Sequence, residues 1–324
     1  MRAIIGITAG DPAGIGLEVT LKALQKTQPA AHWVLFTTRA SFERNAPAIP
    51  FQWIDSLDRI PDTDNVCVYP VSAGDPAIRF GKLSSAAGAE ALSCLKAASN
   101  AALSSQIQAI VTAPVNKFAI GPDFHGQTDY LADAAGRTQF AMAFFAPTFK
   151  VVLATIHMSL RDALAKLNTG LYVDLIRFVD SELKRFHFPS RRIAIAAINP
   201  HAGENGMFGD DDDRLLRPAV DYCAAEGIQV SGPHSADSLY YRAHSGEFDV
   251  VIAPYHDQGL VPVKLIAHGS STNVTLGLPY VRTSPDHGTA FDIAGKGIAD
   301  PEGMISAMKC AVDLTERFHA KGDS

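Results

Sequence analysis

The 324-residue sequence is poor in cysteine and has no excess of basic residues. Its four cysteines form no CxxC pair, which argues against a disulfide framework or a thiolate zinc site and indicates free core thiols. Lys and Arg number 28 against 34 Asp and Glu, so the chain lacks the positive charge that nucleic acid attracts. No apolar run approaches the ~20 residues of a membrane helix, and no signal peptide precedes the first apolar run. We therefore expect a cytoplasmic protein with no nucleic-acid or membrane partner.

The chain also lacks a standard phosphate-binding motif in its first turn. Gly10, Gly14 and Gly16 separate an expected strand at 2–9 from an amphipathic helix at 17–25. These glycines do not follow the G-x-G-x-x-G spacing, and no GK[ST] follows them. The turn alone is therefore a weak indication of a ligand.

Short β-branched apolar runs alternate with amphipathic segments along the whole chain. This alternation predicts an α/β fold with mostly parallel sheets and helices on both faces. We expect two α/β/α domains with a cleft between them. Residues 1–125 and 285–324 form the first, and 126–284 form the second. Four carboxylates at 210–213 open an expected helix, and we interpret them as a solvated start favoured by the helix dipole.

Three histidines directly follow apolar runs that we expect to be buried strands. His157 follows the run at 151–156, His201 the run at 192–198, and His256 the run at 249–253. In open parallel sheets the carboxyl ends of the strands form the ligand-binding edge. Three neutral imidazoles meeting there would bind one divalent metal and leave positions open for water or substrate. Such a metal suits hydrolysis, aldol chemistry or alcohol oxidation, so the reaction stays open at this point.

The loop at 286–300 favours alcohol oxidation. Its glycines allow a ligand to approach the backbone closely, and Asp292 could accept hydrogen bonds from ribose hydroxyls. HGTAFDIAGKGIADP resembles the cofactor loop of the isopropylmalate and isocitrate dehydrogenases. TAGDPAGIG, TAPVNK, NPHAGE and YHDQG extend the likeness over nearly all of the chain, which resembles the 4-hydroxythreonine-4-phosphate dehydrogenase family of pyridoxal phosphate biosynthesis.

The resemblance implies a fold, a reaction and a set of site residues. It implies an isopropylmalate dehydrogenase-like fold and a homodimer whose active site contains residues of both subunits. The reaction would be oxidation of the 3-hydroxyl of 4-phosphooxy-L-threonine by NAD, with NADP as the alternative, to a β-keto acid that decarboxylates. One Zn, Mg or Co ion per site would bind His157, His201 and His256. Contacts to NAD would come from Gly288, Thr289, Ala290, Asp292 and Asp300.

The small anionic substrate would bind Thr128, Lys264, Asn273 and Arg282. Asp257 and Lys264, which lie seven residues apart, would assist proton movement. The family has G-H-T-E where this chain has Gly126, Gln127, Thr128 and Asp129. Gln127 replaces a phosphate-contacting histidine; its amide can still donate a hydrogen bond but cannot carry positive charge. We expect Gln127 to bind the substrate together with Thr128, Lys264, Asn273 and Arg282, and we call these five residues the anion cradle.

The substrate therefore stays open. Phosphorylated threonate or erythronate and a cyclic dihydrodiol carboxylate are alternatives to 4-phosphooxy-threonine. Two other classes also remain: a metal-dependent hydrolase or aldolase, which the 286–300 loop disfavours, and a non-catalytic small-molecule binding protein.

Overall fold

The computed structural model describes residues 2–27 and 30–320. The chain forms two compact units: Met1–Phe140 joins Thr272–His319 in the first, and the second is built on Ala141–Ser271. Each unit combines helices with mostly parallel strands, so the predicted α/β class is confirmed. The domain boundaries were predicted near residues 125 and 285. In the structure the chain passes from the first unit to the second after Phe140 and returns to the first after Ser271. None of the described helices is long and apolar enough to cross a membrane.

The sheet of the first unit is parallel except at one edge. Its strand order is β3 (Phe51–Trp53), β4 (Val66–Ser72), β2 (His32–Thr38), β1 (Ile4–Thr8), β5 (Ala109–Thr112), β12 (Val281–Pro285) and β11 (Thr272–Leu276). Only the β11 pairing with β12 is antiparallel among the described pairs of this unit. The carboxyl ends of β1, β5 and β12 therefore lie at one edge of the sheet.

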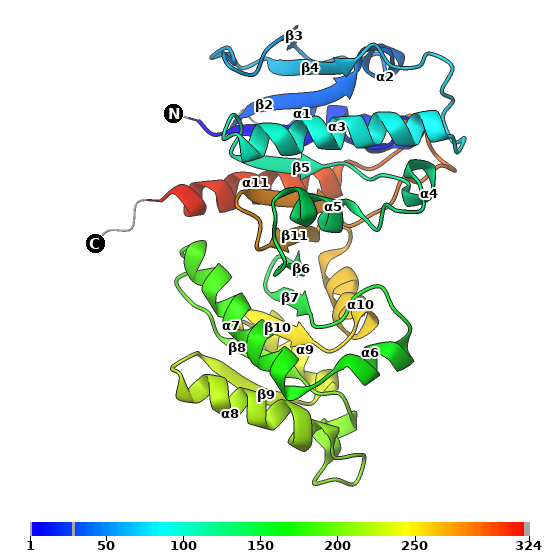
Figure 1. The fold of residues 1–324 in the computed structure, drawn as a ribbon. Helices are drawn as coiled ribbons and strands as arrows, with labels where there is room; N and C mark the ends of the chain where they lie inside the picture. The colour runs from blue at the N-terminus through cyan, green and yellow to red at the C-terminus, as the bar shows by residue number, and fades with distance from the viewer. Residues whose placement is uncertain (1, 28–29, 321–324) are drawn as a thin grey trace. The chain divides into compact units, whose positions relative to one another are not determined.

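Long helices cover this sheet. They are α1 (Gly16–Lys26), α3 (Ser85–Leu103) and α11 (Glu302–His319), with the shorter α2 (Arg39–Arg44), α4 (Lys117–Ile120) and α5 (Gln127–Ala134). Helix α3 crosses in front of β1 and β2 in Figure 1, and α11 packs on β12 and α1. Leu131 and Ala132 of α5 join the core beneath α3, which explains why the first unit continues past residue 125.

The second unit has the strand order β6 (Ala141–Phe145), β7 (Lys150–Leu153), β10 (Val250–Ala253), β8 (Ile193–Ala196) and β9 (Val230–His234). Its helices are α6 (Leu160–Lys166), α7 (Thr169–Arg185), α8 (Arg217–Ala225), α9 (Ala236–His244) and α10 (His256–Ala267), with the short turns η1 (Pro200–Gly203) and η2 (Asp212–Leu216). The sequence pattern does not predict β9. It contains Gly232 and Pro233, residues that are rare in strands.

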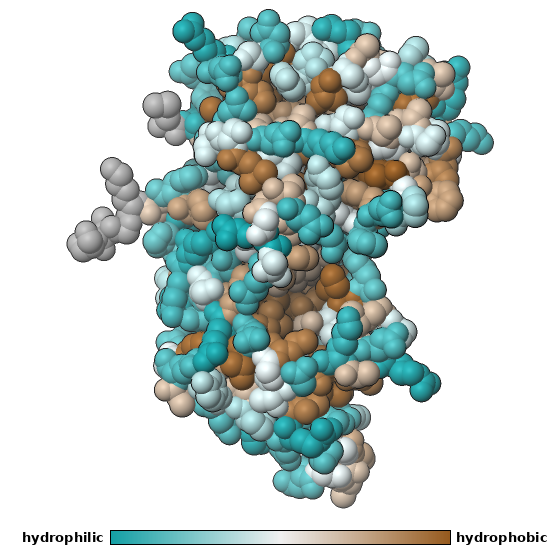
Figure 2. Space-filling view, in the orientation of Figure 1, coloured by the Kyte–Doolittle hydropathy of each residue, from teal (hydrophilic) through white to brown (hydrophobic). Residues whose placement is uncertain are grey.

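Apolar side chains remain on the surface of the second unit. Figure 2 shows hydrophobic surface in the area between α7 and α10 as they are drawn in Figure 1. On α10, Val261 is 65% exposed and Leu265 is 71% exposed. Leu160 and Leu164 of α6 are also exposed. Each pair is four residues apart, so each forms an apolar stripe along its helix.

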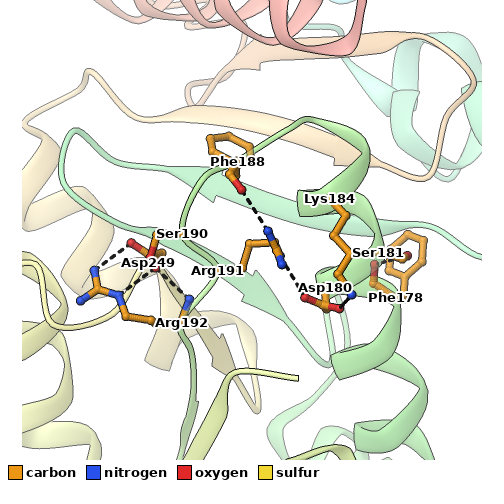
Figure 3. Close-up of polar contacts among 9 residues, drawn as sticks. All are labelled: Phe178, Asp180, Ser181, Lys184, Phe188, Ser190, Arg191, Arg192 and Asp249. Carbon is orange, nitrogen blue, oxygen red and sulfur yellow. Dashed lines mark hydrogen bonds and ion pairs between the residues drawn. The ribbon is translucent and has the colours of Figure 1, made fainter. Parts of the chain in front are cut away.

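Two carboxylates connect the elements of the second unit (Figure 3). Asp249, just before β10, accepts hydrogen bonds from the side chain and backbone N–H of Arg192 at 2.8–3.0 Å. It also accepts from the Ser190 hydroxyl at 2.7 Å. Asp180 of α7 binds Lys184 and Arg191. The segment that leads into β8 is thereby fastened to α7 on one side and to the start of β10 on the other.

Candidate active site

A buried arginine lies at the centre of the candidate anion site of the first unit. Arg282, on β12, is 3% exposed. Its guanidinium donates to the hydroxyls of Thr112, Thr128 and Thr275, which lie on β5, α5 and β11, at 2.7–3.2 Å. Burial lowers the pKa of Arg282 to about 10, so the side chain is still a cation at neutral pH. None of the ion pairs in the described part of the chain includes Arg282, so this charge is available to an anion.

The strand register explains why these polar groups share one face. Thr8 and Thr112 lie opposite each other in the β1–β5 pair, and Asn273 lies opposite Ser284 in the β11–β12 pair. Arg282 is two residues before Ser284, and alternate side chains of a strand point to the same face. The buried atoms Thr8 Oγ1 and Asn273 Oδ1 have no hydrogen-bond partner among the described residues. Each of these oxygens can therefore accept a further hydrogen bond.

Gln127 has a defined amide orientation at the start of α5. Its Nε2 donates to the Ala113 carbonyl at 3.2 Å. A carbonyl only accepts, so the nitrogen of Gln127 must face Ala113 and the amide oxygen must point away from it. That oxygen is buried and has no partner among the described residues. Gln127 therefore presents an acceptor, which favours a hydroxyl or ammonium donor over a phosphate oxygen.

The structure brings Thr128 and Arg282 into direct contact and adds three residues that the sequence analysis missed. Thr112 and Thr275 bind Arg282, but in the sequence each is an ordinary β-branched strand residue. Asp11 is 1% exposed and accepts a hydrogen bond from the Ala13 N–H at 2.8 Å. Its other oxygen has no partner among the described residues, and burial raises its pKa.

The loop predicted to bind NAD has an exposed centre. Asp292 and Gly288 are exposed, and a methyl group on Gly288 would contact nothing within 4 Å. Ala290 has a left-handed φ of 41°. Asp300 accepts a hydrogen bond from the Glu302 N–H at 3.1 Å and so caps the first turn of α11. Thr289 has its carbonyl bonded to the Ile15 N–H at 3.0 Å.

Two of the predicted metal ligands line one pocket in the second unit. The ring centroids of His157 and His256 are 5.8 Å apart, and both rings line a pocket of about 240 Å³. The Thr155 hydroxyl donates to the Pro254 carbonyl at 2.7 Å and so joins the chain ends beyond β7 and β10. The Asp257 carboxylate accepts from Nδ1 of His256 at 2.7 Å, which leaves Nε2 available for a metal. A carboxylate bound to the second nitrogen is common among metal-binding histidines.

His201 lies in a turn of unusual backbone conformation. His201, Ala202, Glu204 and Asn205 all have φ between 42° and 57°, a region that costs a residue with a side chain about 1–2 kcal/mol. Asp212 stabilises this turn. Its carboxylate accepts the backbone N–H groups of Ile198 at 2.7 Å and Asn199 at 3.0 Å.

The interpretation of 210–213 as a solvated helix start was therefore wrong for one residue. Asp212 is completely buried. The sequence did not reveal this because four consecutive aspartates give no sign of which one points inward.

Within one chain, the described residues contain no group of three or more His, Cys, Asp or Glu side chains arranged to hold a metal ion. The structure brings His157 and His256 together and does not place His201 with them. The imidazoles nevertheless suit a divalent metal by donor type, because neutral nitrogen ligands are common to zinc and cobalt sites. Asp257 and Lys264 lie two turns apart on α10, and both are exposed.

Comparison with known proteins supplies the family. The family model described as "Pyridoxal phosphate biosynthetic protein PdxA" matches residues 27–311. The chain belongs to the PdxA family. It is 39% identical to the D-threonate 4-phosphate dehydrogenase of Salmonella typhimurium, covering 96% of this chain and 98% of that one. It is 38% identical to the 4-hydroxythreonine-4-phosphate dehydrogenase of Beijerinckia indica, covering 96% and 94%.

A solved PdxA-family structure has the same fold. The 4-hydroxythreonine-4-phosphate dehydrogenase of Klebsiella pneumoniae matches with a TM-score of 0.88 and 37% identity, covering 97% of this chain and 98% of that one. The predicted resemblance is thus confirmed, and the chain is a dehydrogenase of the PdxA family.

Proposed function

We propose that this chain oxidises the 3-hydroxyl of a small phosphorylated hydroxy acid, with NAD as acceptor and one divalent metal ion, in the cytoplasm. 4-Phosphooxy-L-threonine is the expected substrate, and the product is a β-keto acid that decarboxylates. The observation that carries this proposal is Arg282, a buried cation held by neutral hydroxyls. A buried charge without a counter-ion is costly, so an anionic substrate would both bind and stabilise it.

The nicotinamide ring would accept the hydride from the substrate carbon, and the metal would polarise the reacting hydroxyl. Arg282 would bind an anionic group of the substrate, and Thr128, already bound to Arg282, would orient it. Asn273 would add its unpartnered amide oxygen. Asp292 would accept from the ribose hydroxyls, and its negative charge would disfavour the 2′-phosphate of NADP.

The second unit would supply the metal ligands and the proton-handling groups. His157, His201 and His256 would hold the metal. Asp257 orients His256 through its hydrogen bond and is expected, with Lys264, to receive and pass on the proton of the hydroxyl. Lys264 would also contact the anionic substrate.

We also propose a homodimer in which both subunits contribute to each active site. One support is that the three histidines do not form a single group within one chain. Another is the exposed apolar stripes of α6 and α10, because Leu160 and His256 line the same pocket. Sedimentation velocity tests this. Wild-type protein should sediment as a dimer, Leu265→Glu should shift it toward monomer, and an active wild-type monomer at all loadings would contradict the proposal.

D-threonate 4-phosphate is a second candidate substrate. Several relatives that match this chain over nearly its full length act, by name, on that compound. It carries a hydroxyl where 4-phosphooxy-threonine carries an ammonium group, and the Gln127 oxygen can accept from either.

A substrate panel assayed for NADH formation with added divalent metal tests the proposal and selects between these substrates. The panel includes both phosphorylated acids, their unphosphorylated forms and a cyclic dihydrodiol carboxylate. Turnover of only unphosphorylated compounds would overturn the phosphorylated-substrate assignment.

A further inference from the structure

Helix α1 is fastened to the far end of the loop predicted to bind NAD. The Lys22 ammonium donates to the carbonyls of Gly297 at 2.9 Å and Ala299 at 2.8 Å. It also donates to Glu18 at 2.8 Å, one turn earlier on α1. Glu18 in turn accepts the backbone N–H of Ala299 at 2.9 Å. All three donors of the ammonium group are therefore used. Three hydrogen bonds connect Glu18 and Lys22 with this short segment, and a fourth joins the two side chains to each other.

The near end of the same loop is fastened by the turn that precedes α1. The Ile15 N–H donates to the Thr289 carbonyl at 3.0 Å. A methyl group on Gly14 would lie 2.8 Å from that carbonyl oxygen, so only glycine allows this approach. The glycine-rich turn that weakly indicated a ligand site thus supports another loop.

A third segment, which contains Phe80 and Gly81, also packs against the 286–300 loop. The Gly81 N–H donates to the Ala13 carbonyl at 2.8 Å, and a methyl group on Gly81 would lie 2.7 Å from the Phe291 carbonyl oxygen. Gly295 packs in the same close manner on the Phe80 ring. The loop is therefore held along its length, while Asp292 between the two fastened ends stays exposed.

We propose that Glu18 and Lys22 are positioning residues for the nicotinamide dinucleotide. They fix the 297–299 end of the loop so that the exposed segment with Asp292 is preformed before the nucleotide binds. A preformed loop avoids the entropic cost of ordering on binding, so loosening it should weaken nucleotide binding while the chemical step is unchanged. This inference rests on the proposed assignment of the loop to NAD.

The test compares Lys22→Met with Lys26→Met. Lys26 is an exposed lysine one turn further along α1, so its replacement removes the same charge from the same helix. NADH affinity is measured by fluorescence titration, and kcat and both KM values by steady-state assay. Lys22→Met should raise the Kd for NADH and the KM for NAD by about tenfold, as expected from lost charge-assisted hydrogen bonds. Its kcat and its KM for the acid substrate should match those of the wild type.

Two further variants keep the test decisive. Glu18→Gln should weaken NADH binding in the same direction if Lys22→Met does not fold, and Lys22→Arg should restore most of the affinity because a guanidinium also donates to two carbonyls. Equal NADH affinity in wild type and in folded Lys22 and Glu18 variants would overturn this inference alone. A wild-type protein that binds no nicotinamide dinucleotide would overturn the proposed function and this inference with it.

Discussion

Arg282 of the first unit and Asp212 of the second are both buried charged side chains near predicted functional residues, and they have opposite surroundings. Arg282 of the first unit is held by the hydroxyls of three threonines, which are neutral and leave its charge uncompensated. Asp212 of the second unit accepts two backbone N–H groups from the turn that leads to His201. The threonine hydroxyls orient the Arg282 guanidinium without neutralising it. The Asp212 carboxylate is instead occupied by the backbone N–H groups that donate to it.

This difference separates a ligand-binding charge from a structural one. Hydroxyls orient the Arg282 guanidinium without neutralising it, so its electrostatic attraction remains available to a substrate. The Asp212 carboxylate is engaged by the backbone it stabilises, and that backbone includes residues in a costly left-handed conformation. Replacing Arg282 should therefore damage activity and spare stability, whereas replacing Asp212 should damage stability first.

The largest expected effect is on catalysis by Arg282→Met. Loss of the buried Arg282 charge should lower kcat/KM for the phosphorylated substrate by roughly 100- to 1,000-fold, from one or two charge-assisted hydrogen bonds. The melting temperature should be unchanged or higher, because a buried uncompensated charge costs free energy. Thermal melts with inorganic phosphate give a second measurement, since phosphate should stabilise the wild type and not the variant.

The control for this variant is Arg59→Met, an exposed arginine in the same unit. It should keep wild-type kcat/KM and the response to phosphate. A strongly destabilised Arg282→Met protein with near-normal kcat/KM would reverse the comparison between the two buried charges.

Asp212→Asn should have the next largest effect, now on stability. The amide offers one acceptor where the carboxylate offers two, and its NH2 group would face a backbone N–H. We expect the free energy of unfolding to fall by about 2–4 kcal/mol, measured by urea denaturation. Asp213→Asn, one residue along and half-exposed in a pair with Arg217, should cost less than about 0.5 kcal/mol. Equal losses of unfolding free energy in the two variants would contradict the stabilising role of Asp212.

Much of the fold followed from the sequence, but the polar contacts did not. Continuous apolar runs such as 107–113 and 249–253 identified buried parallel strands, because only a strand covered on both faces tolerates them. Arg282 and Thr128 came from the resemblance and are indeed in contact. Thr112 escaped notice because its contact depends on strand register, and no local pattern connects it with Arg282, 170 residues further along the chain. Thr275 is only seven residues before Arg282, but in the sequence it is an ordinary β-branched strand residue.

The backbone features of the site were also beyond the sequence. The left-handed run at His201 involves alanine and glutamate, residues that normally avoid positive φ, so propensity alone predicts the opposite. At the turn 10–16 the unusual residues were visible in the sequence, but their structural role was not. Its glycines were recognised, but close approach to Thr289 explains Gly14 without any bound phosphate.

The ion pair of Asp249 gives a smaller, pH-dependent effect on the stability of the second unit. Burial acts to raise its pKa, but hydrogen bonds from Arg192 and Ser190 outweigh burial and lower the pKa to about 2, from an ordinary value of 3.8. A depressed pKa stabilises the fold above pH 4, and the contribution disappears as the pH falls from about 4 to about 2. Asp249→Asn should lose roughly 1 kcal/mol at pH 7 after screening by solvent. Urea melts should show this difference shrinking below pH 4, and a constant difference down to pH 2 would contradict the assignment.

The smallest expected effect concerns Gln127, the neutral neighbour of the Arg282 cradle. Its amide nitrogen is committed to Ala113, so the unpartnered group is an oxygen that repels phosphate. In Gln127→His one ring nitrogen can still donate to Ala113, and protonation gives the other nitrogen an N–H as well. We expect kcat/KM for 4-phosphooxy-threonine to rise about two- to tenfold, from one added hydrogen bond to a charged group.

The pH dependence of this gain in kcat/KM distinguishes an effect of the imidazole charge from an effect of side-chain shape. The ratio of kcat/KM between Gln127→His and wild type should increase as the pH falls through about 6.5, where an ordinary imidazole becomes charged. Gln127→Asn, which keeps an amide but shortens its reach to Ala113, should show no such pH dependence. If the ratio is flat with pH, or if the native enzyme oxidises only an unphosphorylated diol carboxylate, then the Gln127 oxygen faces a hydroxyl of the substrate, and the phosphate is either absent or bound elsewhere.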